Sequence, residues 1–165
     1  MTDEFLDLVD EYDRVIGKQQ RSEVYAMGLN NFRVVNVFIA NRKDELWIPR
    51  RTQDKKIFPL CLDFSMGGHV ESGETYEMAL KRELQEELNL NLEDLSYRCL
   101  GHLAPKEGVS SFMKVYEIHV NTTPNYNPDD FSEYFWLTPL ALLAKVAQGE
   151  AVKSDLPKIL KKFYS

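Results

Sequence analysis

The chain has 165 residues, of which 44% are hydrophobic, and this composition is typical of one folded domain spanning residues 1–165. The 26 acidic and 20 basic residues give a formal net charge of −6, which argues against nucleic acid or an anionic membrane surface as a general partner. The acidic first ten residues do not resemble a signal peptide, and no apolar run is long enough to span a bilayer, so we expect a cytoplasmic protein. Cys61 and Cys99 are far apart in the sequence and are expected to be buried, reduced thiols.

Short apolar runs predict strands in the first 70 residues, at positions 5–9, 33–40 and 45–49, and no helix of useful length there. The period then changes, and residues 74–88 are expected to form an amphipathic helix. After this helix we expect two strands, at 96–103 and 112–120, and a polar loop at 121–130. A last strand is expected at 133–137, and helices at 139–148 and 155–163. This order of elements predicts an α/β sandwich with a mixed β-sheet and one central helix that carries glutamates.

The predicted central helix has an apolar stripe and an acidic arc side by side. The stripe is formed by leucines that recur every four residues, Leu80, Leu84 and Leu88. At about 100° per residue, Glu83, Glu86 and Glu87 fall on one arc beside this stripe, at the edge of the predicted core. Like charges crowded together repel one another, so we expect a positive partner to compensate them.

Divalent cations are the natural partner for this arc, because Mg²⁺ and Mn²⁺ prefer oxygen ligands. Gly67 and Gly68 precede the helix, and a backbone without Cβ can turn its carbonyls toward a metal or its amides toward a phosphate. Arg82 lies away from the arc, and we expect it to pair with Glu74 or to hold Glu86 in place. The alternative, a merely solvated acidic face, is disfavoured by the spacing that follows.

The same segment resembles the Nudix box, which reads Gly, five residues, Glu, seven residues, Arg-Glu, an aliphatic residue, any residue, Glu-Glu, any residue, Gly and an aliphatic residue. The matching positions are Gly68, Glu74, Arg82, Glu83, Leu84, Glu86, Glu87 and Leu90. The one departure is Asn89, which stands where the family has Gly. That position follows the helix and requires a left-handed backbone, for which Asn is second only to Gly. Residues 68–90 therefore resemble a Nudix hydrolase, and the resemblance implies the family's α/β/α fold.

The resemblance implies a metal-dependent hydrolase in which water attacks phosphorus and cleaves a phosphoanhydride bond. The substrate would be a nucleoside di- or triphosphate or a compound linked to a nucleoside diphosphate. The implied cofactor is Mg²⁺ or Mn²⁺, with the metal held by Gly67, Glu83, Glu86 and Glu87. The implied catalytic residues are Arg82, Glu83, Glu86 and Glu133. The general base stays open among Glu86, Glu107 and Glu133.

A weaker resemblance connects residues 8–17 and 65–69 to isopentenyl-diphosphate isomerases, a branch of the same superfamily. Those enzymes need a cysteine directly before the Gly-His pair, where this chain has Gly67. They also use histidine ligands upstream of that point, whereas this chain has only His69, His102 and His119. An isomerase-like enzyme is therefore the first alternative. A Nudix fold kept as a binding module is the second, although such modules typically lose the box carboxylates that are retained here.

Signals for substrate recognition are weaker. Arg50 and Arg51 follow a predicted strand and are candidates for binding phosphates, with an exposed basic turn as the alternative. Most aromatic residues belong to cores, but four could stack on a nucleobase: Phe32, Tyr116, Tyr126 and Trp136. The expected partner is a small diphosphate, in the first instance a nucleotide. A homodimer is left open, and no membrane or nucleic-acid partner is expected.

Overall fold

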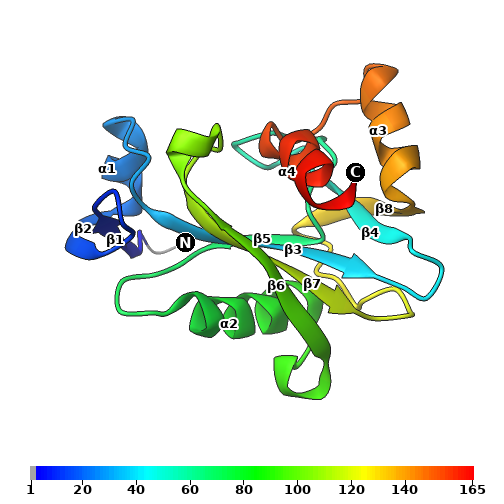
Figure 1. The fold of residues 1–165 in the computed structure, drawn as a ribbon, viewed down its shortest axis with the longest axis horizontal. Coiled ribbons are helices and arrows are strands. Elements are labelled where there is room, and N and C mark those ends of the chain that lie inside the picture. Colours follow the sequence, from blue (N-terminus) through cyan, green and yellow to red (C-terminus); the bar gives the residue numbers. More distant parts are fainter. Residues whose placement is uncertain (1–2) are drawn as a thin grey trace.

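The computed structural model describes residues 3–165, which build a six-stranded mixed sheet with helices on both faces (Figure 1). The strands lie in the order β6-β7-β3-β4-β8, and β5 pairs with the free stretch of β3. Only β3 and β7 run parallel, and every other pair in this sheet is antiparallel. The strands are β3 (Arg33–Ala40), β4 (Leu46–Arg51), β5 (Met66–His69), β6 (Ser96–Leu103), β7 (Phe112–His119) and β8 (Phe131–Leu137).

Helix α2 (Tyr76–Leu88) covers one face of the sheet, and α3 (Pro139–Ala147) and α4 (Asp155–Tyr164) cover the other (Figure 1). The central strand β3 supplies both cores, because side chains alternate across a strand. Val37 and Ile39 are fully buried on the α2 side, while Phe38 is fully buried among residues of α3 and α4. The predicted α/β sandwich with a mixed sheet is therefore confirmed.

A small layer at one end of the sheet holds the segment that leads into α2. It consists of the hairpin β1 (Phe5–Val9) and β2 (Val15–Gln20) and the short helix α1 (Arg21–Ala26). The Ser72 amide donates to the Phe5 carbonyl at 2.8 Å, and the Ser72 hydroxyl donates to Asp7 Oδ1 at 2.7 Å. The N-terminal hairpin thereby fixes the loop before the glutamate-bearing helix.

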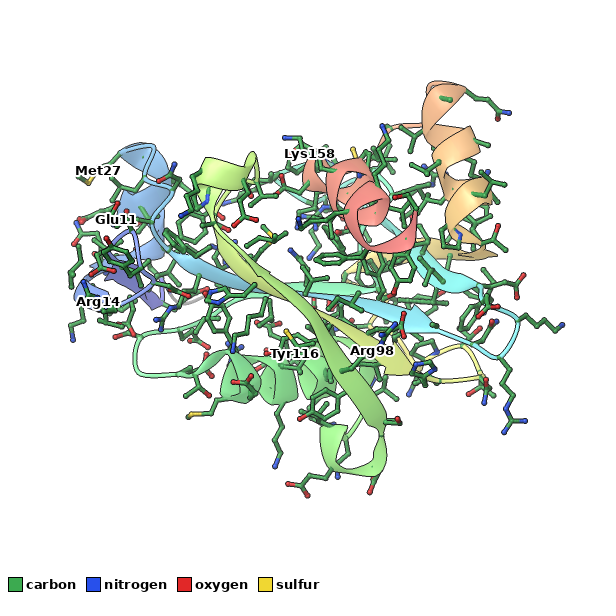
Figure 2. All side chains as sticks on the ribbon, in the orientation of Figure 1. Glu11, Arg14, Met27, Arg98, Tyr116 and Lys158 are labelled. Atoms are coloured by element: carbon green, nitrogen blue, oxygen red, sulfur yellow. The ribbon has the colours of Figure 1, made fainter. Side chains whose placement is uncertain are left out.

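All six predicted strands and all three predicted helices are present, with end shifts that have local causes. Helix α2 begins at Tyr76 and not at 74, because the side chain of Thr75 accepts a hydrogen bond from the Met78 amide and caps the helix. Strand β8 begins at Phe131, two residues before the predicted start at 133, because residue 131 pairs with Arg51 of β4. Tyr116 on β7 lies at the junction of the sheet with α2 (Figure 2), where its hydroxyl donates to Glu77 Oε1 at 2.8 Å.

Some expectations are wrong. The sequence predicts no helix before residue 70, yet α1 forms there, and it predicts neither β2 nor β5. Strand β5 contains two glycines and has no strand-like periodicity, and it is extended because it pairs with β3. The cysteines are unpaired, as expected, but Cys61 is only half-buried and Cys99 is exposed on β6. Across residues 3–165, no helix combines the length and the apolar character needed to cross a membrane.

Candidate active site

Helix α2 is anchored on the sheet by its apolar stripe, and this anchoring orients its acidic arc. The leucines of its apolar stripe, Leu80, Leu84 and Leu88, are fully buried against the sheet. The helix ends at Asn89, whose φ of 54° and ψ of 37° are left-handed, as the sequence predicts. The Asn89 amide donates to the Gln85 carbonyl and closes the last turn. Burial of the stripe leaves the glutamates at the edge of the core.

The glycine before the helix allows the closest approach in the site. A Cβ atom placed on Gly68 would lie 2.7 Å from Glu83 Oε1 and closer still to the Cγ and Cδ atoms of that side chain. No larger residue fits there unless Glu83 moves. The absence of a side chain at Gly68 therefore lets the Glu83 carboxylate lie directly against strand β5.

Arg82 is the hub of the acidic cluster. Its Nε and Nη2 atoms form a two-pronged pair with Glu74, both at 2.8 Å, as the sequence analysis predicts. Its Nη1 atom donates to Glu83 Oε1 at 2.8 Å and to Glu86 Oε2 at 3.4 Å, and Nη2 pairs with Glu71 at 2.9 Å. The expectation that Arg82 points away from the arc is thus wrong, since the long side chain curves back to it. The guanidinium orients these carboxylates.

Glu87 has a buried carboxylate oxygen without a partner. Its Oε2 atom is buried and forms no hydrogen bond within residues 3–165. Burial, followed by repulsion from Glu83, Asp130 and Asp63, raises the pKa of Glu87 well above its usual range. An unsatisfied carboxylate oxygen in such a place is unfavourable, and a cation bound there would compensate it.

Glu83 shares this environment. Burial is the largest influence on the pKa of Glu83 and outweighs the hydrogen bond from Arg82, while the charges of Glu86 and Glu71 add repulsion. Together these raise the pKa of Glu83 to about 7. Glu86 differs because its side chain is 59% exposed and its contact with Arg82 is long. The cluster therefore combines two half-buried carboxylates with raised pKa values and one carboxylate that is open to water.

The donor set fits a hard divalent cation. Carboxylate and carbonyl oxygens are the ligands that Mg²⁺ and Mn²⁺ prefer, and the unpartnered oxygen of Glu87 marks where positive charge is missing. The ligands are not preassembled, since within residues 3–165 no three His, Cys, Asp or Glu side chains converge as a metal site. Glu83 and Glu86 instead contact Arg82. Metal binding would require these two carboxylates to exchange part of that contact for the cation.

The remaining predicted residues lie elsewhere. Arg50 is paired with Glu133 and, at 2.7 Å, with Glu150, so neither the predicted phosphate ligand nor the candidate base is free. Arg51 donates to Asp63 Oδ2 at 2.9 Å. Glu107 lies in the exposed short helix Pro105–Glu107, and within residues 3–165 no ion pair joins it to the glutamate cluster.

The aromatic candidates for base stacking are mostly part of the packing. Phe32 is buried and stacks on His69 with ring centroids 5.7 Å apart, and Tyr116 is buried under the sheet. Tyr126 packs against Trp47, and the Trp136 indole donates to Thr123. These contacts are those of core side chains.

His69 follows the two glycines, and its imidazole ring contacts Tyr25 of α1. The hydroxyl of Tyr25 lies 2.6 Å from His69 Nε2. Burial, and then the positive charges of Arg21, Lys153 and Arg82, lower the pKa of His69 to about 3, so the ring is neutral at physiological pH. The ring of His69, at the end of β5, is therefore a neutral hydrogen-bonding group.

Sequence reasoning missed several residues that the fold brings to this site. Asp63 is 2% exposed, and its charge and that of Asp130 act on Glu87. Lys153 reaches Gly67 from the segment before α4, and Asn36 reaches it from β3. The one local signal was Asp63, an acid between the apolar residues Leu62 and Phe64, which is the pattern of a buried charge.

Comparison with known proteins gives one consistent family. The NUDIX domain model matches residues 30–157. An uncharacterized Nudix hydrolase from Nostoc sp. is 59% identical over 98% of this chain and 96% of its own length. The crystal structure of DR0079 from Deinococcus radiodurans covers 98% of this chain and 100% of its own, at 47% identity and a TM-score of 0.93. An isopentenyl-diphosphate Delta-isomerase from Klebsiella pneumoniae is 26% identical over 89% of this chain and 83% of its own length.

Proposed function

The chain belongs to the Nudix family, whose hydrolases cleave pyrophosphate bonds, and from this premise we propose that it is a divalent-metal-dependent hydrolase of nucleoside diphosphate derivatives. Membership makes it a hydrolase acting on acid anhydrides. The proposal adds the metal, Mg²⁺ or Mn²⁺, and the substrate class, a nucleoside di- or triphosphate or a compound linked to a nucleoside diphosphate. The observation that carries it is the buried, unpartnered oxygen of Glu87 beside Glu83 in a complete set of box carboxylates.

The cation would be held by Glu83, Glu86, Glu87 and the carbonyl of Gly67. When bound, it would neutralise the diphosphate and make an attacking water more acidic. The protein's own part is to hold the carboxylates in place. Arg82 fixes Glu74 and Glu83 and restrains Glu86, so we assign it a positioning role. Gly68 leaves room for Glu83 against β5.

Among the three candidates for the general base we assign Glu86. A base must accept a proton from water, and Glu86 is the exposed carboxylate of the cluster. Glu133 is paired with Arg50, and Glu107 lies in an exposed turn without a contact to the cluster. Replacing Glu86 by Gln is expected to leave the fold intact and to reduce turnover at least about a hundredfold.

The deciding experiment is a substrate screen with Mg²⁺ or Mn²⁺ and product identification by mass. It compares nucleoside di- and triphosphates, dinucleoside polyphosphates, nucleotide sugars and isopentenyl diphosphate. Metal-dependent release of phosphate or of a nucleotide supports the proposal. The absence of any such release would favour a binding module, and an isomerised product without loss of phosphate would revive the isomerase. Gly67, at the place of the isomerase cysteine, argues against that last result.

The proposed partner is a small-molecule diphosphate, with no membrane or nucleic-acid partner. We also propose that the protein works in the cytoplasm, which its two unpaired cysteines support.

A further inference from the structure

The two faces of strand β5 have different neighbours, and the glutamates of α2 lie on only one of these faces. Gly68 faces Glu83 on the side of α2. Gly67 faces the other way, where a Cβ atom would lie 2.8 Å from Asn36 Oδ1 and 3.7 Å from Lys153 Nζ. Two polar groups from distant parts of the chain therefore converge on the one position of β5 that has no side chain to separate them from its backbone.

Lys153 is placed by backbone pairing. The Leu62 amide donates to the Ala151 carbonyl, and the Lys153 amide donates to the Leu62 carbonyl, both at 2.9 Å. Residues 62 and 152 thus form a short parallel bridge that ties the segment before α4 to the segment before β5. Its position is fixed by the fold, and the side chain is 28% exposed.

The ammonium group of Lys153 is not satisfied by the protein. Its nearest carboxylate oxygen, Asp63 Oδ1, is 3.8 Å away, beyond hydrogen-bonding distance. Asp63 is already occupied, because Arg51 donates to its Oδ2 at 2.9 Å and the Phe64 amide donates to its Oδ1 at 2.6 Å. Within residues 3–165, Lys153 Nζ forms no hydrogen bond, although an ammonium has three donors. The Lys153 ammonium is therefore partly exposed and only loosely paired with Asp63, and its donors remain available to an anion that reaches Gly67.

Asn36 is a second, independent observation on the same face. Its side chain is 96% buried, since its exposed fraction is 4%. Its amide nitrogen has only a thioether partner, Met113 Sδ at 3.5 Å, which is a weak acceptor. Its Oδ1 atom faces Gly67 and accepts no hydrogen bond within residues 3–165. Because Oδ1 is an acceptor, it can accept a hydrogen bond from the Lys153 ammonium when that side chain turns toward Gly67.

We propose that Lys153 and Asn36 form a phosphate subsite on the face of β5 opposite the glutamates. The proposal rests on the proposed function, because it places the two phosphates of one substrate on either side of Gly67. One phosphate lies at the cation held by the glutamates and the Gly67 carbonyl. Lys153 would bind an oxygen of the adjacent phosphate as a point charge, and Asn36 Oδ1, which can only accept, would accept a hydrogen bond from the Lys153 ammonium and hold it at Gly67. The two faces together bind a diphosphate across the strand.

The test uses inorganic pyrophosphate as the probe and calorimetry as the readout, with and without Mg²⁺. Lys153→Met is expected to weaken pyrophosphate binding about tenfold or more, which is the loss of one charge-assisted hydrogen bond. Lys153→Arg keeps the charge and should recover most of the affinity. The matched control is Lys161→Met on α4, an exposed lysine that should bind within twofold of the wild type. Thermal melting verifies that each variant is folded.

Steady-state kinetics on the best diphosphate from the substrate screen give a second readout. Lys153→Met should raise KM by about tenfold and change kcat less, because Lys153 binds and does not transfer a proton. Pyrophosphate binding by Lys153→Met equal to that of the wild type would overturn the subsite. If the wild type hydrolyses no diphosphate but binds pyrophosphate in a way that depends on Lys153, the proposed function fails and the subsite stands. If the folded wild type binds no pyrophosphate, the subsite is wrong.

Discussion

Two carboxylates lie on opposite faces of the same sheet and differ in their hydrogen-bond partners and in the direction of their pKa shifts. Glu117 on β7 is 5% exposed and accepts hydrogen bonds from Tyr164 at 2.5 Å and from Arg98 at 3.2 Å (Arg98 is labelled in Figure 2). Although burial opposes its ionisation, these two partners hold the pKa of Glu117 below its usual range. Glu87 on α2 has an oxygen without a partner, and its pKa is raised.

The difference shows that burial of a charge does not by itself mark a site. The charge of Glu117 is compensated by hydrogen-bond donors of the fold, so we interpret it as a stabilising group. Glu87 is repelled by the charges of Glu83, Asp130 and Asp63, and one of its oxygens has no hydrogen-bond partner within residues 3–165.

The largest expected effect comes from neutralising each carboxylate in turn. Glu87→Gln should reduce turnover at least about a hundredfold, because it removes a proposed metal ligand, while the folded state is retained. Glu117→Gln is the matched control. It should leave turnover within about twofold and lower the free energy of unfolding by about 1–3 kcal/mol, because three donors lose a charged acceptor. Steady-state kinetics and urea denaturation measure both, and wild-type turnover in Glu87→Gln would remove Glu87 from the site.

The second prediction concerns metal binding to the same cluster. Adding Mg²⁺ or Mn²⁺ at about a hundred times Kd should stabilise the wild type by about 2.7 kcal/mol. For a chain of this size that corresponds to a rise in Tm of roughly 5–10 °C. The rise should disappear in Glu87→Gln and persist in Glu117→Gln. Equal rises in both variants would show that the cation binds elsewhere.

The pH dependence of stability should have opposite signs at the two carboxylates. In the metal-free protein, Glu83 and Glu87 have raised pKa values, so the folded state binds more protons than the unfolded state between about pH 4.5 and 7. Their contribution to stability is therefore lost as the pH rises through this window. Glu117 has a lowered pKa, and its contribution is lost as the pH falls below the ordinary range of a glutamate.

Urea denaturation from about pH 3 to 8 measures these slopes without metal, since the slope for Glu117 lies at the acidic end of that range. The stability of Glu87→Gln relative to the wild type should increase as the pH rises. The stability of Glu117→Gln relative to the wild type should be lowest at neutral pH and recover toward acidic pH. A difference between Glu87→Gln and the wild type that does not change with pH would contradict the raised pKa.

The smallest effect is expected for a single donor to the satisfied carboxylate. Tyr164→Phe keeps the ring packed against Phe38 and removes the hydroxyl that donates to Glu117. It should lower the free energy of unfolding by about 1 kcal/mol and leave turnover unchanged. Tyr97→Phe, at an exposed position of β6, should stay within about 0.5 kcal/mol of the wild type. Chemical denaturation distinguishes the two, and equal stabilities would mean that the Glu117 network is not stabilising.

Much of the fold could be predicted because its signals are local. The leucine spacing of α2 and the left-handed Asn89 lie within one stretch of chain, so periodicity and C-capping rules apply directly. Strand β5 could not be predicted, since its glycines have no strand propensity and its shape depends on pairing with β3. The same holds for the two arginines after β4. Their phosphate role was inferred from charge alone, and the fold pairs them with Glu133, Glu150 and Asp63.

The sequence by itself determined the reaction class, because residues 68–90 match the family motif at all of its charged positions. The spacing of that motif can be read without knowing how the chain packs. It also determined that Glu83, Glu86 and Glu87 share one helix arc, which follows from the 3.6-residue period. Only the tertiary structure decided which of their oxygens lacks a partner and which distant groups meet at Gly67. The reason is that spacing along one helix is set by local geometry. The approach of Asp63, Asp130, Asn36 and Lys153 depends on strand order and register, which no single segment encodes.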